Sequence, residues 1–348
     1  MKGTLYTPVV TTRDAELKGF SFLKESTKKS IVPIFEITRS RRSKKNPIGD
    51  VKRSLEKALD AIGNGRFVLD VCGLESQSNA QVVALLDESN GFENWCKFLD
   101  DVPENAIPVL HLEEPFAKQN FEVQAKKVLS KFDCVALRVP TSYMQADEAI
   151  AALLKILPKG KSFVGFVDAG YVKETTKAGA LARMTELLNF FVGTGVAYCA
   201  PLSSSFPSSV LDDGYGKDAT GEFPIVEVEI SNTLKDDPNL RSLNIVHGDY
   251  SLIHPQDFTG TVTNWVPRID YPLERKVFYH RVRRPKGGYK KCAESVVGDG
   301  RYDPMKDVWG ESQVLVAAFG VPPGKNPSFW ISVRVNLHIE RQVIRLRS

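Results

Sequence analysis

Apolar runs of strand length alternate with segments of helical period over most of the first 203 residues of this chain. In the intervening segments apolar residues recur at helical spacing, as in Asp50–Ile62, and stop signals follow at Gly63 and Pro158. Strands that are apolar throughout and separated by helices are typical of a parallel sheet buried on both faces. The alternation therefore predicts an α/β fold. The six clear apolar runs cover residues 31–38, 67–74, 106–112, 134–140, 162–172 and 196–203.

Two weaker strand candidates follow, Leu243–Tyr250 and Trp265–Tyr271, and they bring the number of strand–helix units to eight. Eight units favour a TIM-like (β/α)8 barrel over the alternative, an open doubly wound sheet. The segment Val226–Ile230 also alternates like a strand, but the pattern does not assign it a place. The alternation breaks after residue 271. We therefore expect a barrel over residues 1–271 and a C-terminal α+β extension over residues 272–348, packed on the barrel.

The composition is that of a globular protein with a packed core, with 42% apolar and 25% charged residues. The net charge of +4 is small for 348 residues, so a basic partner surface has to come from local clustering. The 5 cysteines are odd in number and form no CxxC pair, which argues against a disulfide framework or a structural zinc site.

The N-terminal segment lacks the apolar core of a signal peptide. No apolar run approaches the roughly 20 residues of a membrane-spanning helix. We therefore expect a cytoplasmic protein without a membrane partner.

Polar residues follow most of the predicted strands at their carboxyl ends. In a barrel these ends converge on one mouth, where function gathers. The candidate catalytic residues at this mouth are Glu36, Asp70, Asp168, Asp249 and His254. The candidate ligand-binding residues are Arg39, Arg41, Arg42, Arg138, His247, Tyr250, Arg268, Arg281 and His338.

Four acids at one mouth, Glu36, Asp70, Glu113 and Asp168, would repel one another unless something neutralised them. A divalent cation held by carboxylate oxygens is one solution and would be the cofactor. Arg138 as an internal counter-ion is a second. A raised pKa that leaves one acid protonated, as a proton donor, is a third. Some of these acids would instead cap helices or face solvent.

The histidines differ in their surroundings. His111 alternates with Val109 in an apolar run, which favours a packing role over catalysis. His247 precedes a glycine and His254 precedes a proline, so both lie where a strand gives way to a turn. For these two, a role in a site and a role in the turn are equally compatible with the pattern.

Two basic clusters, Arg39–Lys45 and Arg281–Lys291, are candidates for binding phosphate. The first directly follows a predicted strand and so belongs to the functional face of a barrel. A solvated loop is the ordinary explanation of any single cluster. No helix-turn-helix, zinc-finger or RNA-binding signature is present, and neither is a GxxxxGK[ST], GxGxxG, HExxH or GxSxG motif.

The order of short motifs along the chain resembles the beta protein family of phage and bacterial genomes. The motifs are "YTPVV", "IVPIFEI" and "FVLDV" in the first half, then "GDYSLIHP", "RIDY", "VFYHR", "YKKCAESVV", "VWGESQVLVAAFG" and "FWISVRVNLHI". The resemblance implies a barrel-type protein of phages, prophages or mobile elements, and it implies no particular reaction. The motif positions it implies are Glu36, Asp70, Gly248, Asp249, Tyr250, His254, Arg268, Tyr271, Arg281, Trp309, Gly310, Asn336 and His338.

The chain departs from this pattern in two places, the basic run Arg39–Lys45 and the aspartate of "RIDY". Both departures weigh against transferring a shared ligand from the family.

Two hypotheses follow. In the first, the chain acts in phage–host conflict or antiviral defence and binds an anionic ligand (phosphate-bearing or nucleic acid) or a phage or host protein at the barrel mouth. In the second, it is a metal-dependent hydrolase or phosphodiesterase, in which rim carboxylates hold a cation, His247 or His254 handles protons, and Arg138 or Arg268 steadies a phosphate.

Overall fold

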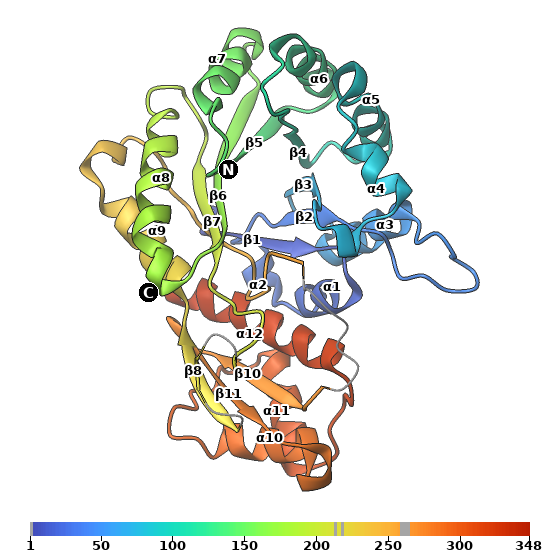
Figure 1. Cartoon of the computed structure of the whole chain (residues 1–348), viewed down its shortest axis with the longest axis vertical. Helices are drawn as coiled ribbons and strands as arrows, with labels where there is room; N and C mark the ends of the chain where they lie inside the picture. Colours follow the sequence, from blue (N-terminus) through green and yellow to red (C-terminus); the bar gives the residue numbers. More distant parts are fainter. Residues whose placement is uncertain (1–2, 212–213, 217–218, 258–264) are drawn as a thin grey trace.

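The computed structural model describes residues 3–211, 214–216, 219–257 and 265–348. Eight parallel strands form a sheet in the order β7-β6-β5-β4-β3-β2-β1-β9. The sheet closes on itself because Cys199 of β7 forms a parallel bridge with Ile245, two residues before β9. The predicted (β/α)8 barrel is confirmed (Figure 1). Its strands are β1 (Tyr6–Thr11), β2 (Ile34–Ile37), β3 (Phe67–Val71), β4 (Ala106–Leu110), β5 (Cys134–Pro140), β6 (Ser162–Tyr171), β7 (Cys199–Ser204) and β9 (His247–Asp249).

One barrel strand was not predicted from the sequence, and one predicted barrel strand is wrong. The barrel begins with Tyr6–Thr11, whose inward side carries the hydroxyls of Thr7 and Thr11, so the segment lacks the continuous apolar run of a central strand. Trp265–Tyr271, expected in the barrel, instead contributes to β10 (Arg268–Pro272), which pairs antiparallel with β11 (Lys276–Arg281). The segment Val226–Ile230 starts a helix, α9.

Helices connect the strands and cover the outside of the barrel (Figure 1). Helix α3 illustrates the local logic: the Asp50 side chain caps its first turn by accepting from the Lys52 N–H, and Gly63 ends it at a φ of 62°. The helices of the barrel are α1 (Asp14–Ser21), α2 (Glu25–Lys28), α3 (Val51–Ile62), α4 (Ala80–Leu85), α5 (Ser89–Phe98), α6 (Lys118–Lys131), α7 (Ala146–Ile156), α8 (Lys177–Asn189) and α9 (Val226–Asp236).

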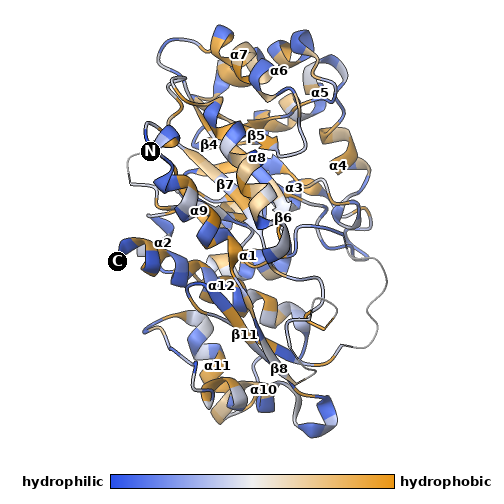
Figure 2. Ribbon diagram, turned by 60° about the vertical axis from the view of Figure 1, so that its left-hand side comes forward, coloured by the Kyte–Doolittle hydropathy of each residue, from blue (hydrophilic) through white to orange (hydrophobic). Residues whose placement is uncertain are grey.

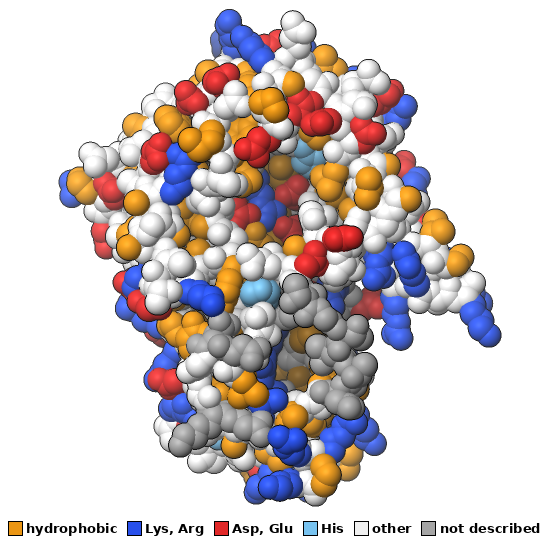
Figure 3. All heavy atoms as spheres, in the orientation of Figure 1, with side chains coloured by type: hydrophobic (Ala, Val, Ile, Leu, Met, Phe, Trp, Pro, Cys, Tyr) orange, Lys and Arg blue, Asp and Glu red, His pale blue; other side chains and the backbone are white. Residues whose placement is uncertain are grey.

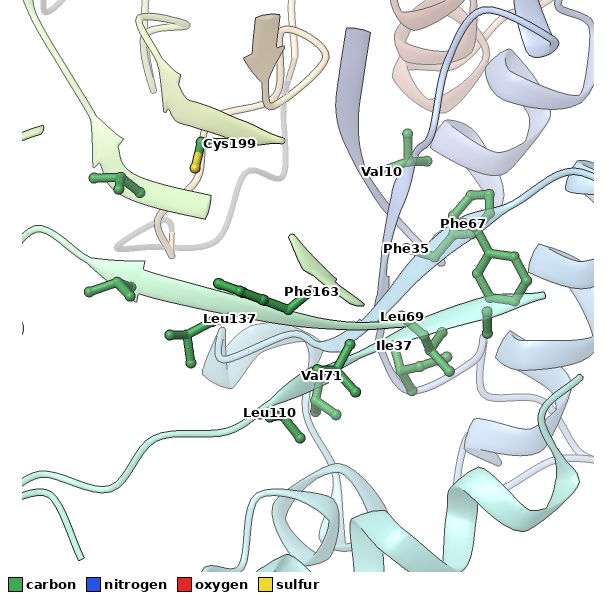
Figure 4. Close-up of a cluster of buried hydrophobic side chains, with 14 of the residues drawn as sticks. Val10, Phe35, Ile37, Phe67, Leu69, Val71, Leu110, Leu137, Phe163 and Cys199 are labelled. Atoms are coloured by element: carbon green, nitrogen blue, oxygen red, sulfur yellow. The ribbon is translucent and has the colours of Figure 1, made fainter. Parts of the chain in front are cut away.

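Alternate side chains of each strand enter two separate cores. Val9, Ile34 and Val68 point into the barrel, where they pack in one cluster. Their neighbours point outward to the helices, and Phe35 and Phe67 lie side by side there with ring centroids 5.8 Å apart (Figure 4). Each such fully buried side chain contributes about 1.5–3 kcal/mol by leaving water. Two apolar faces on each strand explain why the central strands read as unbroken apolar runs.

The C-terminal extension builds a small antiparallel sheet of order β10-β11-β8. Strand β8 (Thr220–Pro224) comes from the segment that follows β7, and β10 begins at Arg268, so the small sheet draws strands from both sides of the predicted boundary at 271 and 272. The division of the chain into a barrel over residues 1–271 and an extension over residues 272–348 stays a prediction. The helices of the extension are α10 (Gly288–Val297), α11 (Trp309–Phe319) and α12 (Pro327–Arg347).

Helix α12 joins the extension to the barrel (Figures 1 and 2). Val335 and Ile339 belong to the outer core of the barrel, whereas Val333 and Leu337 belong to the core of the extension. The helix crosses α1 closely, because the Asn336 side chain donates to the Gly19 carbonyl at 3.0 Å. In the part of the chain that the structure describes, no helix is both long and apolar enough to cross a membrane.

Candidate functional site

A cavity of about 490 Å³ opens at the carboxyl ends of the barrel strands. The space-filling view shows this hollow with acidic, basic and histidine side chains inside it (Figure 3). Its walls come from the barrel strands and the loops that follow them, and also from α12, which contributes Ile331 and Arg334. The extension therefore forms one wall of the barrel mouth. This volume is within the range of small-molecule pockets.

Arg138 lies at the floor of the cavity and holds three carboxylates together. Its Nη1 donates to Glu36 and to Asp70, at 2.7 Å each, and its Nε donates to Asp168 at 2.8 Å. Its Nη2 donates to the Tyr250 hydroxyl at 2.8 Å, and that hydroxyl donates in turn to Asp168. None of the four charged side chains is more than 11% exposed. Three acids surrounding one guanidinium leave the floor negative.

Strand register explains why these groups meet. Glu36 and Asp70 are direct partners on neighbouring parallel strands, so their side chains lie side by side. Asp168 precedes a register shift in β6 that ends at Gly170, whose φ is 59°. The Gly170 N–H donates to the second oxygen of Asp168 at 2.9 Å, which fixes the carboxylate toward Arg138.

The environments of Glu36 and Asp70 move their pKa values in opposite directions. Burial raises the pKa of Glu36 to about 7, in spite of the opposing charge of Arg138 and with help from the nearby charge of Asp70. Burial also acts to raise the pKa of Asp70, but the His111 ring, whose Nε2 lies 3.4 Å away, and the charge of Arg138 outweigh it and lower that pKa to about 2. One acid is therefore substantially protonated at neutral pH while its neighbour is ionised.

Of the three ways to relieve repulsion among these acids, the cavity floor shows two. Arg138 is the counter-ion, and Glu36 is the acid whose pKa is raised. Among residues 3–211, 214–216, 219–257 and 265–348, no group of three or more His, Cys, Asp or Glu side chains is arranged to hold a metal ion. The guanidinium of Arg138 lies where a cation would have to bridge Glu36, Asp70 and Asp168.

Left-handed backbone shapes the cavity at two places. Ser251 and Leu252, both buried, have φ of 53° and 58°, and they turn the chain so that Tyr250 and His254 both line the cavity. Phe92, with φ of 54°, also lines the cavity and lies edge-on to His111. Non-glycine residues in this conformation cost about 1 kcal/mol or more each and are concentrated at functional sites.

The wall that α12 forms carries Arg334, and the buried Glu16 of α1 lines the same cavity. The Arg334 guanidinium stacks on Phe206 at 3.9 Å and donates to Asp270 at 2.7 Å. Its Nε is buried and has no hydrogen-bond partner among the residues that the structure describes. Arg13, an exposed residue at the end of β1, lines the same cavity.

The structure brings six predicted site residues together at the mouth, and a further three lie elsewhere as a group. Asp249, His247 and His338 are fully buried between the barrel wall and α12 and do not line the cavity. The six at the mouth are Glu36, Asp70, Arg138, Asp168, Tyr250 and His254.

Asp249 is the centre of that buried group. It accepts hydrogen bonds from the Tyr6 hydroxyl at 2.5 Å and from the Ser251 N–H at 2.7 Å, and it lies 2.7 Å from the His338 Nε2. Burial acts to raise the pKa of Asp249, but the charge and the hydrogen bond of His338, together with the nearby His247 ring, leave it well below its usual range. Burial lowers the pKa of His247 to about 4. The segment from His247 to His254 thus has two faces, one in the cavity and one in the packing against α12.

The remaining predicted residues lie outside the cavity. Arg39 donates to the Ser76 carbonyl at 3.2 Å, and Arg41 and Arg42 are exposed on the same projecting loop. Arg268 pairs with Asp270 at 2.8 Å. Arg281 lies in β11, in the small sheet.

Sequence reasoning missed Arg13, Phe92 and Arg334. Arg13 follows a strand that the apolar pattern did not reveal. Arg334 belongs to the longest helix, and its approach to the cavity depends on the packing of α12 against α1. Only the "TTRDAE" segment after "YTPVV" carried a local signal, because a basic residue there follows directly on a strand end.

A curated relative, Protein beta of Enterobacteria phage P4, is 28% identical over 343 residues, which cover 97% of this chain and 92% of that protein. Two solved structures of morphinone reductase, one a mutant in complex with tetrahydroNAD, show 12% and 13% identity with TM-scores of 0.27 and 0.29. The two matches cover 70% and 72% of this chain, and 82% and 84% of the morphinone reductase chains. At these TM-scores they carry no functional argument.

The family model described as Beta protein matches residues 6–344, nearly the whole chain. That match includes both the barrel and the extension, together with every side chain of the cavity floor. The chain belongs to the Beta protein family, which has a member in a phage.

Proposed function

We propose that this chain is a phage-associated protein that binds a small phosphate-bearing ligand in the barrel mouth. The observation that carries the proposal is Arg334, a largely buried residue that lines the cavity and whose Nε has no hydrogen-bond partner among the described residues. A buried donor left unpaired costs roughly 1–3 kcal/mol, and the guanidinium of Arg334 can donate charge-assisted hydrogen bonds to a phosphate oxygen. Arg13, at the same mouth, adds a second positive charge.

The floor sets the orientation of the ligand. Arg138 already donates to three carboxylates and one hydroxyl, so it has little capacity left for an anion. The negative floor repels phosphate and offers oxygen acceptors to hydroxyl or N–H groups. A ligand with a phosphate at one end and such donors at the other fits this polarity, with its phosphate toward Arg334.

Calorimetric titration with inorganic phosphate and with nucleoside 5′-monophosphates tests the proposal. Arg13→Ala should weaken binding about tenfold, because it removes one positive charge without altering a buried side chain. Arg66→Ala is the matched control, since Arg66 is also exposed but precedes β3 at the opposite end of the barrel. Equal affinity of wild type and Arg13→Ala, or no binding of any phosphate compound, would contradict the proposal.

A second candidate is nucleic acid bound outside the cavity. The observation that favours it is the projecting loop after β2 (Figure 1), on which Arg41, Arg42, Lys44 and Lys45 are all exposed. Replacing these four residues by alanine should weaken binding of single-stranded DNA and reduce the slope of affinity against salt. Unchanged salt dependence would remove this candidate.

We also propose that the protein acts in phage–host conflict, in the cytoplasm of the host, with a phage or host protein as a further possible partner. The support is the phage relative and the match over the whole chain. Phage challenge of cells that express the wild type or Arg13→Ala would test whether this role depends on the cavity. Equal plating of phage on both strains would show that the role in phage–host conflict does not depend on ligand binding in the cavity.

A further inference from the structure

Glu36 and Asp70 form a pair of carboxyl groups suited to acid–base chemistry. They are register partners on β2 and β3, both line the cavity, and both accept a hydrogen bond from the same nitrogen of Arg138. Only Oε1 of Glu36 bonds to Arg138, so its other oxygen is available to hold a proton. Asp70 is held by the Val71 N–H at 2.8 Å and by the nearby His111, which keeps its carboxylate oriented.

The surroundings assign the two groups different protonation states. The pKa of Glu36 is raised to about 7 and that of Asp70 is lowered to about 2. Two neighbouring acids whose environments separate their pKa values are the pattern of a general acid and its ionised partner.

The negative floor restricts the reaction further. A phosphoryl transfer or an ester hydrolysis develops negative charge in its transition state, which the carboxylates of Asp70 and Asp168 would oppose. Cleavage of a glycosidic bond develops positive charge on the sugar, in an oxocarbenium-like transition state, and two carboxyl groups are its usual catalysts. The same floor would stabilise that charge.

We propose that Glu36 and Asp70 hydrolyse the glycosidic bond of a phosphate-bearing sugar, a step that rests on the phosphate-binding mouth proposed above. Glu36 gives its proton to the leaving oxygen or nitrogen as the bond to the anomeric carbon breaks. An Asp70 oxygen forms a bond to that carbon, because two carboxyl oxygens that each lie 2.7 Å from one nitrogen are too close together to admit a water between them. A water oxygen then replaces Asp70 at the carbon and gives its proton to Glu36. This restores both groups, so one water is consumed and no oxidant or reductant is needed.

Arg138 is a positioning residue in this scheme. Asp168 and Tyr250 hold its guanidinium from the far side, and it fixes Glu36 and Asp70 next to each other. The substrate class includes nucleotides, which have a C–N glycosidic bond, and phosphorylated O-glycosides. Both present donor groups at one end and a phosphate at the other.

The test has two substrate arms. In the first, nucleoside 5′-monophosphates are incubated with the protein and free base is measured by chromatography. In the second, 4-nitrophenyl glucoside 6-phosphates are used and nitrophenol release is followed. Turnover in either arm is the expected result and identifies the class. Glu36→Gln should bind the same compound within about twofold by calorimetry, yet lose at least about 100-fold in turnover.

The wild-type pH profile is a readout that does not depend on a variant folding. A general acid works only while protonated, so the turnover rate should fall as pH rises above about 7, the pKa of Glu36. Glu113→Gln is the matched control, because Glu113 is half-buried in the loop after β4, outside the cavity, and bonds to Asn120. It should leave turnover and its pH profile unchanged.

Three outcomes would overturn the inference. One is binding of these compounds by the wild type without release of base or nitrophenol between pH 5 and 8. The second is a turnover rate that stays at the wild-type level in Glu36→Gln. The third is a turnover rate that falls in Glu113→Gln by as much as it falls in Glu36→Gln. Failure of binding itself would instead contradict the phosphate-binding proposal, and calorimetry separates the two.

Discussion

At the scale of single residues, Arg138 determines what the barrel mouth can bind. Its N–H groups already donate to Glu36, Asp70 and Asp168 and have little capacity left for an anion. Anion binding therefore has to rely on other side chains. The buried carboxyl groups in turn differ in protonation, and this difference has a consequence for stability that does not depend on any ligand.

We predict that Glu36→Gln gains stability relative to wild type as pH rises from 5 to 8. The folded-state pKa of Glu36, about 7, lies above its ordinary value of 4.5, so the native state binds the proton more tightly than the unfolded state. Wild-type stability therefore falls as pH rises between these values, by on the order of 3 kcal/mol in full, at about 1.4 kcal/mol for each pH unit. Glutamine does not titrate and escapes this loss.

Urea denaturation of both proteins at pH 5 and pH 8 measures the difference. A constant gap between wild type and Glu36→Gln across this range would show that the environment of Glu36 is not the one described here.

A second residue-scale prediction concerns the buried group outside the barrel. Asp249→Ala should lower the free energy of unfolding by about 3–5 kcal/mol, because the Tyr6 hydroxyl and the His338 ring lose their buried partner. Asp60→Ala, on the exposed face of α3, is the control and should change stability by less than about 0.5 kcal/mol. An Asp249→Ala protein of wild-type stability that had lost ligand binding would instead indicate a functional role.

At the scale of elements, the alternation of side chains along a strand would have shown in advance that Tyr250 lies on a different face from His247 and Asp249. Side chains at successive strand positions point to opposite faces, so Tyr250 in the cavity implies that Asp249 and its alternate partner His247 do not share one face with it. We predicted one polar wall from a segment whose polar residues divide between two faces. The central strands β2 to β7 were predictable because both faces are apolar.

Other elements escaped the sequence for tertiary reasons. β1 mixes apolar residues with Thr7 and Thr11, which are buried only because the barrel closes over them. Val226–Ile230 has the alternation of a strand, but it forms a helix that places the buried Glu227 against Ser205. Contacts of this kind, between residues far apart in the sequence, cannot be predicted from the periodicity of a short segment.

The crossing of α1 and α12 allows a matched test. A Cβ added at Gly19 would lie 2.5 Å from the Ser332 carbonyl oxygen, whereas one at Gly179 meets nothing within 4 Å. Both glycines are inside helices. Gly19→Ala should therefore lower stability by about 1–3 kcal/mol through overpacking, and Gly179→Ala should raise it by about 0.5–1 kcal/mol through helix propensity.

Thermal denaturation of the two variants decides between packing and propensity. If Gly19→Ala melts at or above the wild-type temperature, α12 does not dock on α1 as closely as described.

At the scale of the whole molecule, α12 links the two parts of the chain chemically as well as mechanically. Arg334 reaches the cavity, and His338, one helical turn later, reaches Asp249 behind the barrel wall. The extension thus completes the mouth with the buried guanidinium of Arg334. Barrel and extension form one functional unit in this account.

The most direct test of the central claim is a crystal structure of the protein soaked with the nucleoside monophosphate that binds most tightly. We predict density in the barrel mouth, with the phosphate within hydrogen-bond distance of the Arg334 guanidinium and the sugar facing Glu36 and Asp70. Density on the loop of Arg41 and Arg42 with an empty mouth, or a phosphate bound against Arg138, would contradict it.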